Sequence, residues 1–105
     1  MRPVLTVLLL LALAAPAGAA LPPDGRYDCV IGTSSILFGT LVVKGKTYKH
    51  RGTKGTLSGT KKDLRLKGGD LGGMRGRWYK AKDGPYEIAL RNPKDDYESI
   101  YCTKA

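Results

Sequence analysis

The sequence predicts an all-β fold, a small antiparallel up-and-down meander of seven or eight short strands that closes into a barrel. Glycine is frequent, with 14 residues in 105, and short apolar or alternating runs recur between glycine-containing breaks. No long stretch carries apolar residues at helical spacing. The links between runs are too short for the crossover that parallel strands need, so neighbouring strands are expected to be antiparallel. A flattened β-sandwich with the same strand order is the structural alternative.

Eight runs are predicted to form these strands, in the order 26–31, 36–43, 47–51, 56–58, 63–67, 76–82, 86–91 and 97–103. The first places Tyr27, Cys29 and Ile31 on one face. The second is the most apolar and is rich in β-formers, which indicates a well-buried strand. In the third, Tyr48 and His50 share a face.

The fourth run is short, because the glycine-containing segment around it is loop-like. The fifth and seventh alternate between apolar and charged residues, as half-buried strands do. The sixth, "GRWYKAK", ends at the turn signal "DGP", and the eighth follows the turn "NPKDD".

Closing the meander into a barrel would remove both open sheet edges. Strands of about five residues rise only ~17 Å, so the expected interior is packed, with a shallow mouth and no deep lipocalin-like cavity. The candidate core consists of inward-facing apolar residues: Ile31, Ile36, Phe38, Leu41, Val43, Tyr48, Leu57, Leu64, Leu66, Trp78, Ile88, Leu90 and Ile100.

Residues 1–20 are predicted to be a secretory signal peptide. A single positive residue precedes an apolar run, and small residues follow it, with cleavage expected after Ala19 or Ala20. The run is short for a bilayer span of ~20 residues, which makes a retained anchor the weaker alternative. Residues 21–105 are expected to form a single small β-barrel domain of an exported bacterial protein, periplasmic or extracellular.

The only two cysteines, Cys29 and Cys102, are predicted to form a disulfide bond, as an even pair does in an oxidising compartment. The closed loop of about 74 residues implies roughly 4 kcal/mol of stabilisation from lost chain entropy. That is comparable to the whole stability of a small domain. The bond would join the first strand to the last. The alternative is a pair of free or metal-binding thiols.

Positive charge is concentrated in the middle of the chain. The sequence carries 18 basic and 9 acidic residues, for a net charge of +9, and the segment 44–82 holds 13 basic residues against Asp63 and Asp70. The basic residues alternate with apolar ones on several predicted strands, so they should collect on the outer face of the sheet. The candidate anion-binding residues are Lys44, Lys46, Lys49, Arg51, Lys54, Lys61, Lys62, Arg65, Lys67, Arg75, Arg77, Lys80 and Lys82.

A cationic face of this kind attracts anionic polymers through counterion release. In an exported protein the expected partners are anionic lipid, lipopolysaccharide or polysaccharide, and no nucleic acid. A general solubility charge without a specific partner is the alternative.

The sequence points to no catalytic residue, metal site or cofactor, so a non-enzymatic protein is expected. His50 is the only histidine, and a histidine base would need a hydroxyl or thiol and an orienting carboxylate beside it. We expect a surface or semi-buried strand histidine between the cations Lys49 and Arg51. A cryptic enzyme that uses His50 is the weaker alternative.

Two further motifs are better explained as turns. The acidic cluster of Asp95, Asp96 and Glu98 lacks the length and ligand spacing of a calcium loop. The segment "GGDLGG", residues 68–73, lacks the Gly-Lys-Ser/Thr of a phosphate-binding loop and is expected to be a strand-to-strand bend.

Four motifs resemble those of a group of short exported bacterial proteins of uncharacterised function. They are "GRYDC" at 25–29, "GTLVVKGKTY" at 39–48, "GGDLGG" at 68–73 with Trp78, and "YC" at 101–102. The second is one residue out of strict spacing. The chain is more loosely similar to periplasmic protease-inhibitor-like barrels and avidin-like barrels. No inhibitory segment or ligand-binding set matches residue by residue, so the resemblance implies a disulfide-closed β fold and assigns no particular activity to the chain.

The function expected from the sequence is therefore an exported, monomeric binding module whose cationic face contacts anionic envelope components. The alternatives are a periplasmic protease inhibitor on a small barrel scaffold and a structural domain with no specific ligand.

Overall fold

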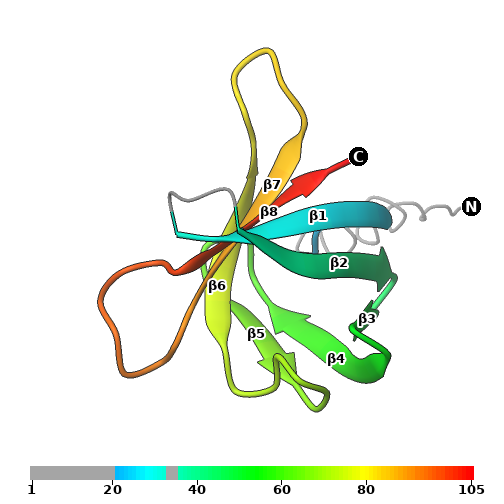
Figure 1. The fold of residues 1–105 in the computed structure, drawn as a ribbon, viewed down its shortest axis with the longest axis vertical. Coiled ribbons are helices and arrows are strands. Elements are labelled where there is room, and N and C mark those ends of the chain that lie inside the picture. The colour runs from blue at the N-terminus through cyan, green and yellow to red at the C-terminus, as the bar shows by residue number, and fades with distance from the viewer. Residues whose placement is uncertain (1–20, 33–35) are drawn as a thin grey trace, which may run out of the picture.

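The computed structural model describes residues 21–32 and 36–105 and shows a closed antiparallel β-barrel (Figure 1). Each strand pairs with the next along the chain, and β1 pairs with β8, so the predicted meander and its closure are confirmed. No helix long and apolar enough to cross a membrane occurs in these residues. The predicted signal peptide, residues 1–20, and its cleavage positions lie outside them. The strands are β1 (Gly25–Ile31), β2 (Leu37–Lys44), β3 (Thr47–His50), β4 (Thr53–Gly59), β5 (Leu64–Lys67), β6 (Arg75–Lys80), β7 (Tyr86–Arg91) and β8 (Ile100–Lys104).

The seam of the barrel is the pairing of β1 with β8. Cys29 lies directly opposite Cys102 in this register, and a disulfide bond joins them. The bond closes a separation of 73 residues. The predicted bond is therefore present, and it fastens the first strand to the last at the closure of the sheet.

β4 is longer than its sequence predicts, since it runs over Thr53–Gly59 and not only over 56–58. Its backbone pairs with β3 on one side and β5 on the other, which outweighs the low strand propensity of its glycines. Gly55 has a structural role here. It lies opposite Tyr48, and a side chain at this position would collide with the Tyr48 ring and with the Gly68 carbonyl.

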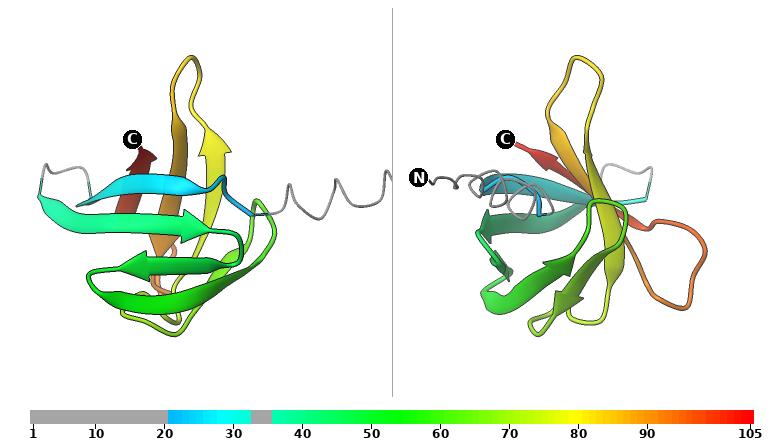
Figure 2. Two further views of the ribbon diagram at one scale, coloured as in Figure 1. Left: turned by 90° about the vertical axis from the view of Figure 1, so that its right-hand side faces the viewer. Right: turned by 180° about the vertical axis from the view of Figure 1, so that it is seen from behind.

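The interior is packed with side chains from every strand. The predicted core positions on β2–β8 are buried, except Phe38, which packs against the cluster while partly exposed; Tyr27 and Leu71 join them. Two core predictions are wrong, because Ile31 is 40% exposed and Ile36 is 62% exposed. The register shifts between Cys29 and Val30, and beyond that point the β1–β2 hairpin projects from the end of the barrel (Figure 2).

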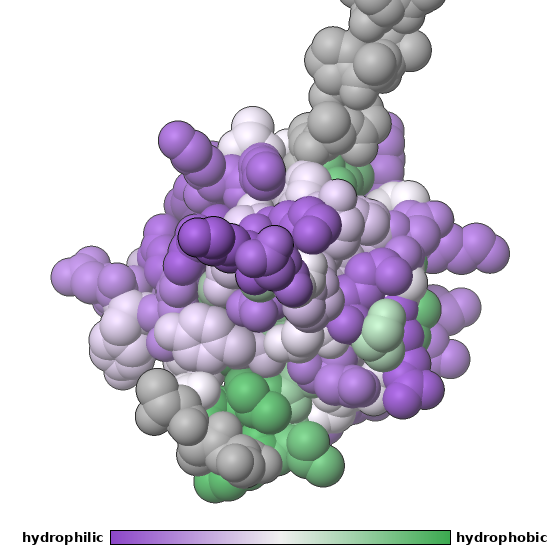
Figure 3. Space-filling model, turned by 90° about the horizontal axis from the view of Figure 1, so that it is seen from above, coloured by the Kyte–Doolittle hydropathy of each residue, from purple (hydrophilic) through white to green (hydrophobic). Residues whose placement is uncertain are grey.

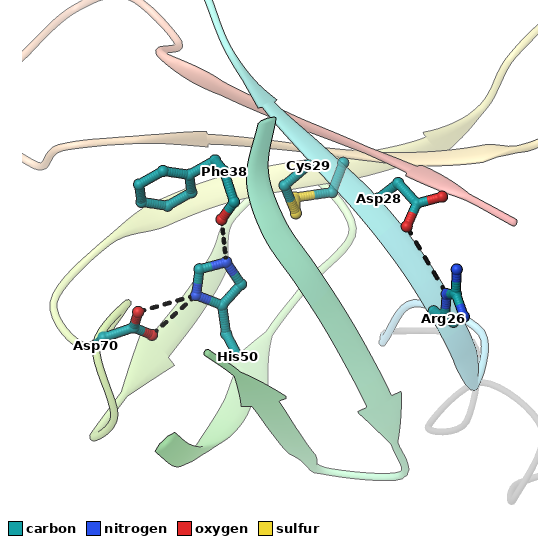
Figure 4. The surroundings of a disulfide bond; sticks show 7 residues. Arg26, Asp28, Cys29, Phe38, His50 and Asp70 are labelled. Carbon is teal, nitrogen blue, oxygen red and sulfur yellow. Dashed lines mark hydrogen bonds and ion pairs between the residues drawn. A yellow bond between two sulfur atoms is a disulfide. The ribbon is translucent and has the colours of Figure 1, made fainter. Parts of the chain in front are cut away.

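The prediction for His50 is also wrong, because its side chain lies inside the barrel and is 1% exposed. Its Nε2 donates to the carbonyl oxygen of Phe38 at 2.8 Å, and its Nδ1 lies 2.9 Å from a carboxylate oxygen of Asp70 (Figure 4). Lys49 and Arg51, the neighbours in sequence, are exposed. Burial is tolerated because both ring nitrogens have hydrogen-bond partners.

The turn at residues 68–73 folds onto the end of the barrel and is held by β3. The backbone N–H of Leu71 donates to the Tyr48 hydroxyl at 3.2 Å, and that hydroxyl donates to the Gly68 carbonyl. Leu71 is 1% exposed. Together with the His50–Asp70 contact, these bonds fix the inner side of β3 and so hold its outer side in place.

Candidate anion-binding face

The outer surface of β2, β3 and β4 carries a row of cations that the strand register sets side by side. Val42 pairs with Lys49, and Lys49 pairs with Lys54. Val42 and Lys49 point outward, because their neighbours on the same strands point into the core, and Lys54 shares their face of the sheet. Directly paired residues on one face lie about 5 Å apart at Cβ. The two ammonium groups therefore stand beside an exposed valine.

A second row lies parallel to the first, one pleat further along the strands. Lys44 pairs with Thr47, Thr47 with Thr56, and Thr56 with Lys67 on β5. The Thr47 hydroxyl donates to the Lys44 carbonyl at 2.8 Å, which fixes the threonine side chain. The two rows together place four lysines on one continuous surface.

We call the surface formed by Val42, Lys44, Thr47, Lys49, Lys54 and Thr56 the cationic groove, and Lys67 lies at its edge. The groove has a volume of about 550 Å³. Val42 is 41% exposed and contributes an apolar floor. Lysine stems can lie along such a floor while the ammonium groups stay in water. The arrangement offers charge-assisted hydrogen bonds to phosphate, sulfate or carboxylate groups.

The groove lysines form no ion pair with any residue that the structure describes. All nine acidic residues of the sequence lie in the described parts of the chain, and the ion pairs formed there do not involve Lys44, Lys49, Lys54 or Lys67. Asp24 reaches the turn after β2, where it accepts a hydrogen bond from the backbone N–H of Gly45 at 2.8 Å. The lysine charges therefore remain available to an external anion.

Unlike the groove lysines, the arginines of β5 and β6 are in ion pairs, and two of them share the carboxylate of Asp63. Arg65 Nη2 lies 3.0 Å from one of its oxygens and Arg75 Nη2 lies 2.8 Å from the other. The hydrogen bonds from Arg75 first, and then from Arg65, lower the pKa of Asp63, so the carboxylate remains charged at neutral pH. These two predicted site residues are engaged within the fold.

Arg77, the other arginine of β6, is also paired. Its guanidinium makes two hydrogen bonds to Glu98, at 2.6 and 3.0 Å, and lies 4.7 Å from the ring centre of Tyr79. The bond to Glu98 raises the pKa of Arg77. Glu98 belongs to the acidic cluster that the sequence predicts to be a turn, and its side chain is bonded to Arg77 on β6.

A smaller hollow of about 420 Å³ lies on the other side of the barrel, at Lys61, Lys62, Arg77, Trp78 and Tyr79. The Lys61 ammonium lies 5.1 Å from the centre of the Trp78 ring. Trp78 is only 7% exposed, so the ring gives a ligand little contact area.

The remaining predicted residues lie in or beside turns. Arg51 follows β3 and packs 5.3 Å above the ring of Phe38. The Lys80 ammonium donates to the Gly84 carbonyl at 3.0 Å. Lys46 and Lys82 are exposed in the turns after β2 and after β6. The thirteen candidate residues are thus divided among an open groove, several engaged positions and exposed turn positions outside both.

His50 has the orienting carboxylate that a catalytic histidine needs, from Asp70 at Nδ1, but its other nitrogen has a different partner. Its Nε2 is bonded to a carbonyl oxygen, not to a hydroxyl group. Thr53 Oγ1 lies 3.0 Å from Asp70 on the other side of the ring. In residues 21–32 and 36–105, no three His, Cys, Asp or Glu side chains come close enough together to hold a metal ion.

The groove lysines are among the residues that the sequence predicts, but the uncharged residues that shape the groove, Val42, Thr47 and Thr56, are not. The alternation of inward and outward positions on β2 and β3 could have placed them there. The chain matches no family model, no curated protein and no solved structure.

Proposed function

We propose that this protein is an exported, non-enzymatic and monomeric binding module, and that the cationic groove contacts anionic components of the bacterial envelope. The candidate partners are anionic lipid, lipopolysaccharide and acidic polysaccharide. The disulfide bond is compatible with an oxidising compartment outside the cytoplasm.

One observation carries the proposal: the lysines of β2, β3 and β4 stand together over an apolar floor, and no acidic side chain of the described residues forms an ion pair with them. Charges that serve only solubility are usually interspersed with opposite charges. Here the ion-paired carboxylates lie elsewhere, against Arg26, His50 and the arginines of β5 and β6. This separation favours an external anion as the partner of the groove.

The test is retention on immobilised heparin and on immobilised lipopolysaccharide in a salt gradient. The groove variant is Lys44→Gln/Lys49→Gln/Lys54→Gln. The matched control, Lys82→Gln/Lys94→Gln/Lys104→Gln, loses the same charge from exposed or partly exposed positions outside the groove.

We expect affinity to fall at least tenfold in the groove variant, taking about 1 kcal/mol for each lysine near an anionic surface. We expect the control to stay close to the unmodified protein. Equal elution of the two variants would refute the proposal.

A further inference from the structure

The exposed aliphatic side chains gather on one hairpin. The large hydrophobic residues that are exposed in the described parts of the chain are Ile31, Ile36, Leu37, Val42 and Tyr97, and all except Tyr97 belong to β1, β2 or the link between them. Leu37 is 78% exposed. Figure 3 shows a hydrophobic patch at one edge of a face that is otherwise largely hydrophilic. Such patches on small proteins mark interaction sites.

The apolar residues of β2 continue into the cationic groove. A hollow of about 310 Å³ at Leu37 and Thr40 lies on the outer surface of the strand, and Val42, the next outward residue, forms the floor of the groove. Asp28 also lines this hollow, where its carboxylate lies 3.7 Å from Arg26. Apolar surface and the groove lysines therefore meet along a single strand.

Cations also stand beside the exposed end of β2. A side chain on Gly39 would touch the Arg51 side chain, which places that arginine next to the strand. The Arg51 guanidinium packs over Phe38, and Lys49 lies opposite Val42. Aliphatic side chains flanked by basic ones are the pattern of proteins that lie on membranes, where apolar groups enter the acyl boundary and cations contact headgroup phosphates.

We propose that the outer surface of β2 docks on an anionic phospholipid bilayer, with Leu37 entering the acyl boundary and the cationic groove contacting the phosphates. The inference rests on the proposed function and narrows its ligand to a lipid surface. A hydrated polysaccharide could satisfy the lysines, but it offers no apolar phase for a leucine.

Binding to vesicles tests this directly. The probes are vesicles of phosphatidylcholine with and without phosphatidylglycerol, and the variants are Leu37→Ser and the groove variant. We expect Leu37→Ser to bind the anionic vesicles roughly fivefold more weakly, because less apolar surface is buried. Its retention on heparin should be unchanged. The groove variant should bind both heparin and the anionic vesicles more weakly. The unmodified protein should bind vesicles of phosphatidylcholine alone only weakly.

Depth of insertion gives a second readout. In Leu37→Trp the new indole should be quenched by brominated acyl chains in phosphatidylglycerol vesicles. Lys82→Trp, which places an indole at an exposed position after β6 on the opposite side of the barrel, is the control and should not be quenched. Trp78 is 7% exposed and contributes a constant background.

The outcomes separate the two proposals. If Leu37→Ser binds anionic vesicles as the unmodified protein does, or if the indole at position 37 is not quenched, the insertion proposal is refuted, and the proposed function stands on the heparin result. If the groove variant binds heparin and vesicles normally, the proposed function itself is refuted.

Discussion

The two cationic sides of the barrel carry charges of the same sign, but only one side neutralises them with ion pairs. We call the side of β2, β3 and β4 the open side and the side of β5 and β6 the closed side. On β2, β3 and β4 the charges are lysines, and none of them is in an ion pair with a described residue. On β5 and β6 the arginines are held by Asp63 and Glu98. Arginine suits such pairing because its planar guanidinium binds carboxylates with two donors, whereas the lysine ammonium is a strongly hydrated point charge.

The difference shows that the number of charges in a segment does not define a binding surface. The sequence presents the segment 44–82 as one basic block. In the barrel this block is divided, so that one part stabilises contacts within the protein and the other part faces solvent uncompensated. Variants that change one part, the other, or the structure that supports both should therefore behave differently.

The largest effect should come from breaking the disulfide bond at the β1–β8 seam, because both cationic sides depend on the closed barrel. Cys29→Ala/Cys102→Ala should lower the free energy of unfolding by roughly 4 kcal/mol, since the bond closes most of the chain. Urea denaturation followed by circular dichroism measures this. A variant as stable as the original would show that backbone pairing alone closes the barrel.

The second-largest effect should come from His50, whose hydrogen bonds hold β3 beneath the groove. His50→Ala leaves a cavity inside the barrel and the Phe38 carbonyl without its hydrogen-bond donor, while Asp70 is exposed and keeps the hydrogen bond from Thr53. We expect a loss of about 3 kcal/mol. Lys49→Ala, one residue earlier and facing outward, should change stability by less than about 0.5 kcal/mol. Similar losses in the two variants on urea denaturation would contradict the assignment of the two faces of β3.

Removing the carboxylate that pairs with the arginines should leave their charges free to bind an external anion, as the groove lysines do. Asp63→Asn removes the carboxylate that holds Arg65 and Arg75. We expect heparin affinity to rise about twofold to threefold, because freed guanidinium groups can meet phosphate or sulfate. The matched control is Asp95→Asn, which removes one negative charge and no ion pair of the described residues. Equal gains in the two variants would mean that only net charge matters.

One further effect is absent at neutral pH and concerns the core behind β1. Burial, and then the charge of Asp24, raise the pKa of Tyr27 to about 12, above its ordinary value of 10.0. The neutral phenol is therefore favoured in the folded state. Its contribution is fully present below pH 10 and is lost as the pH rises toward 12. Tyr27→Phe should show a shallower loss of stability over this range in urea titrations at fixed pH. The same slope in both proteins would contradict the assignment.

The barrel could be predicted from the sequence because its evidence is local: alternation, glycine breaks, short links and two cysteines near the ends. The inward face of His50 also follows from its alternation with Tyr48, but its full burial could not be predicted, because it depends on Asp70 and on the Phe38 carbonyl, which reach it only when the barrel closes. The exposure of Ile36 depends on a register shift that apolar character does not reveal. The groove lysines could be predicted as charges, but their separation from the ion-paired acidic residues follows from strand register and from the contacts of Asp63 and Glu98.

The most direct test of the open and closed sides is a titration of the ¹⁵N-labelled protein with a short heparin oligosaccharide, followed by amide chemical shifts. We predict that the largest amide shift changes cluster at Val42, Thr47, Lys49 and Lys54. The amide signals of the arginines of β5 and β6 should change little. Shifts centred on those arginines, or spread evenly over all basic residues, would contradict the division of the barrel into an open and a closed side.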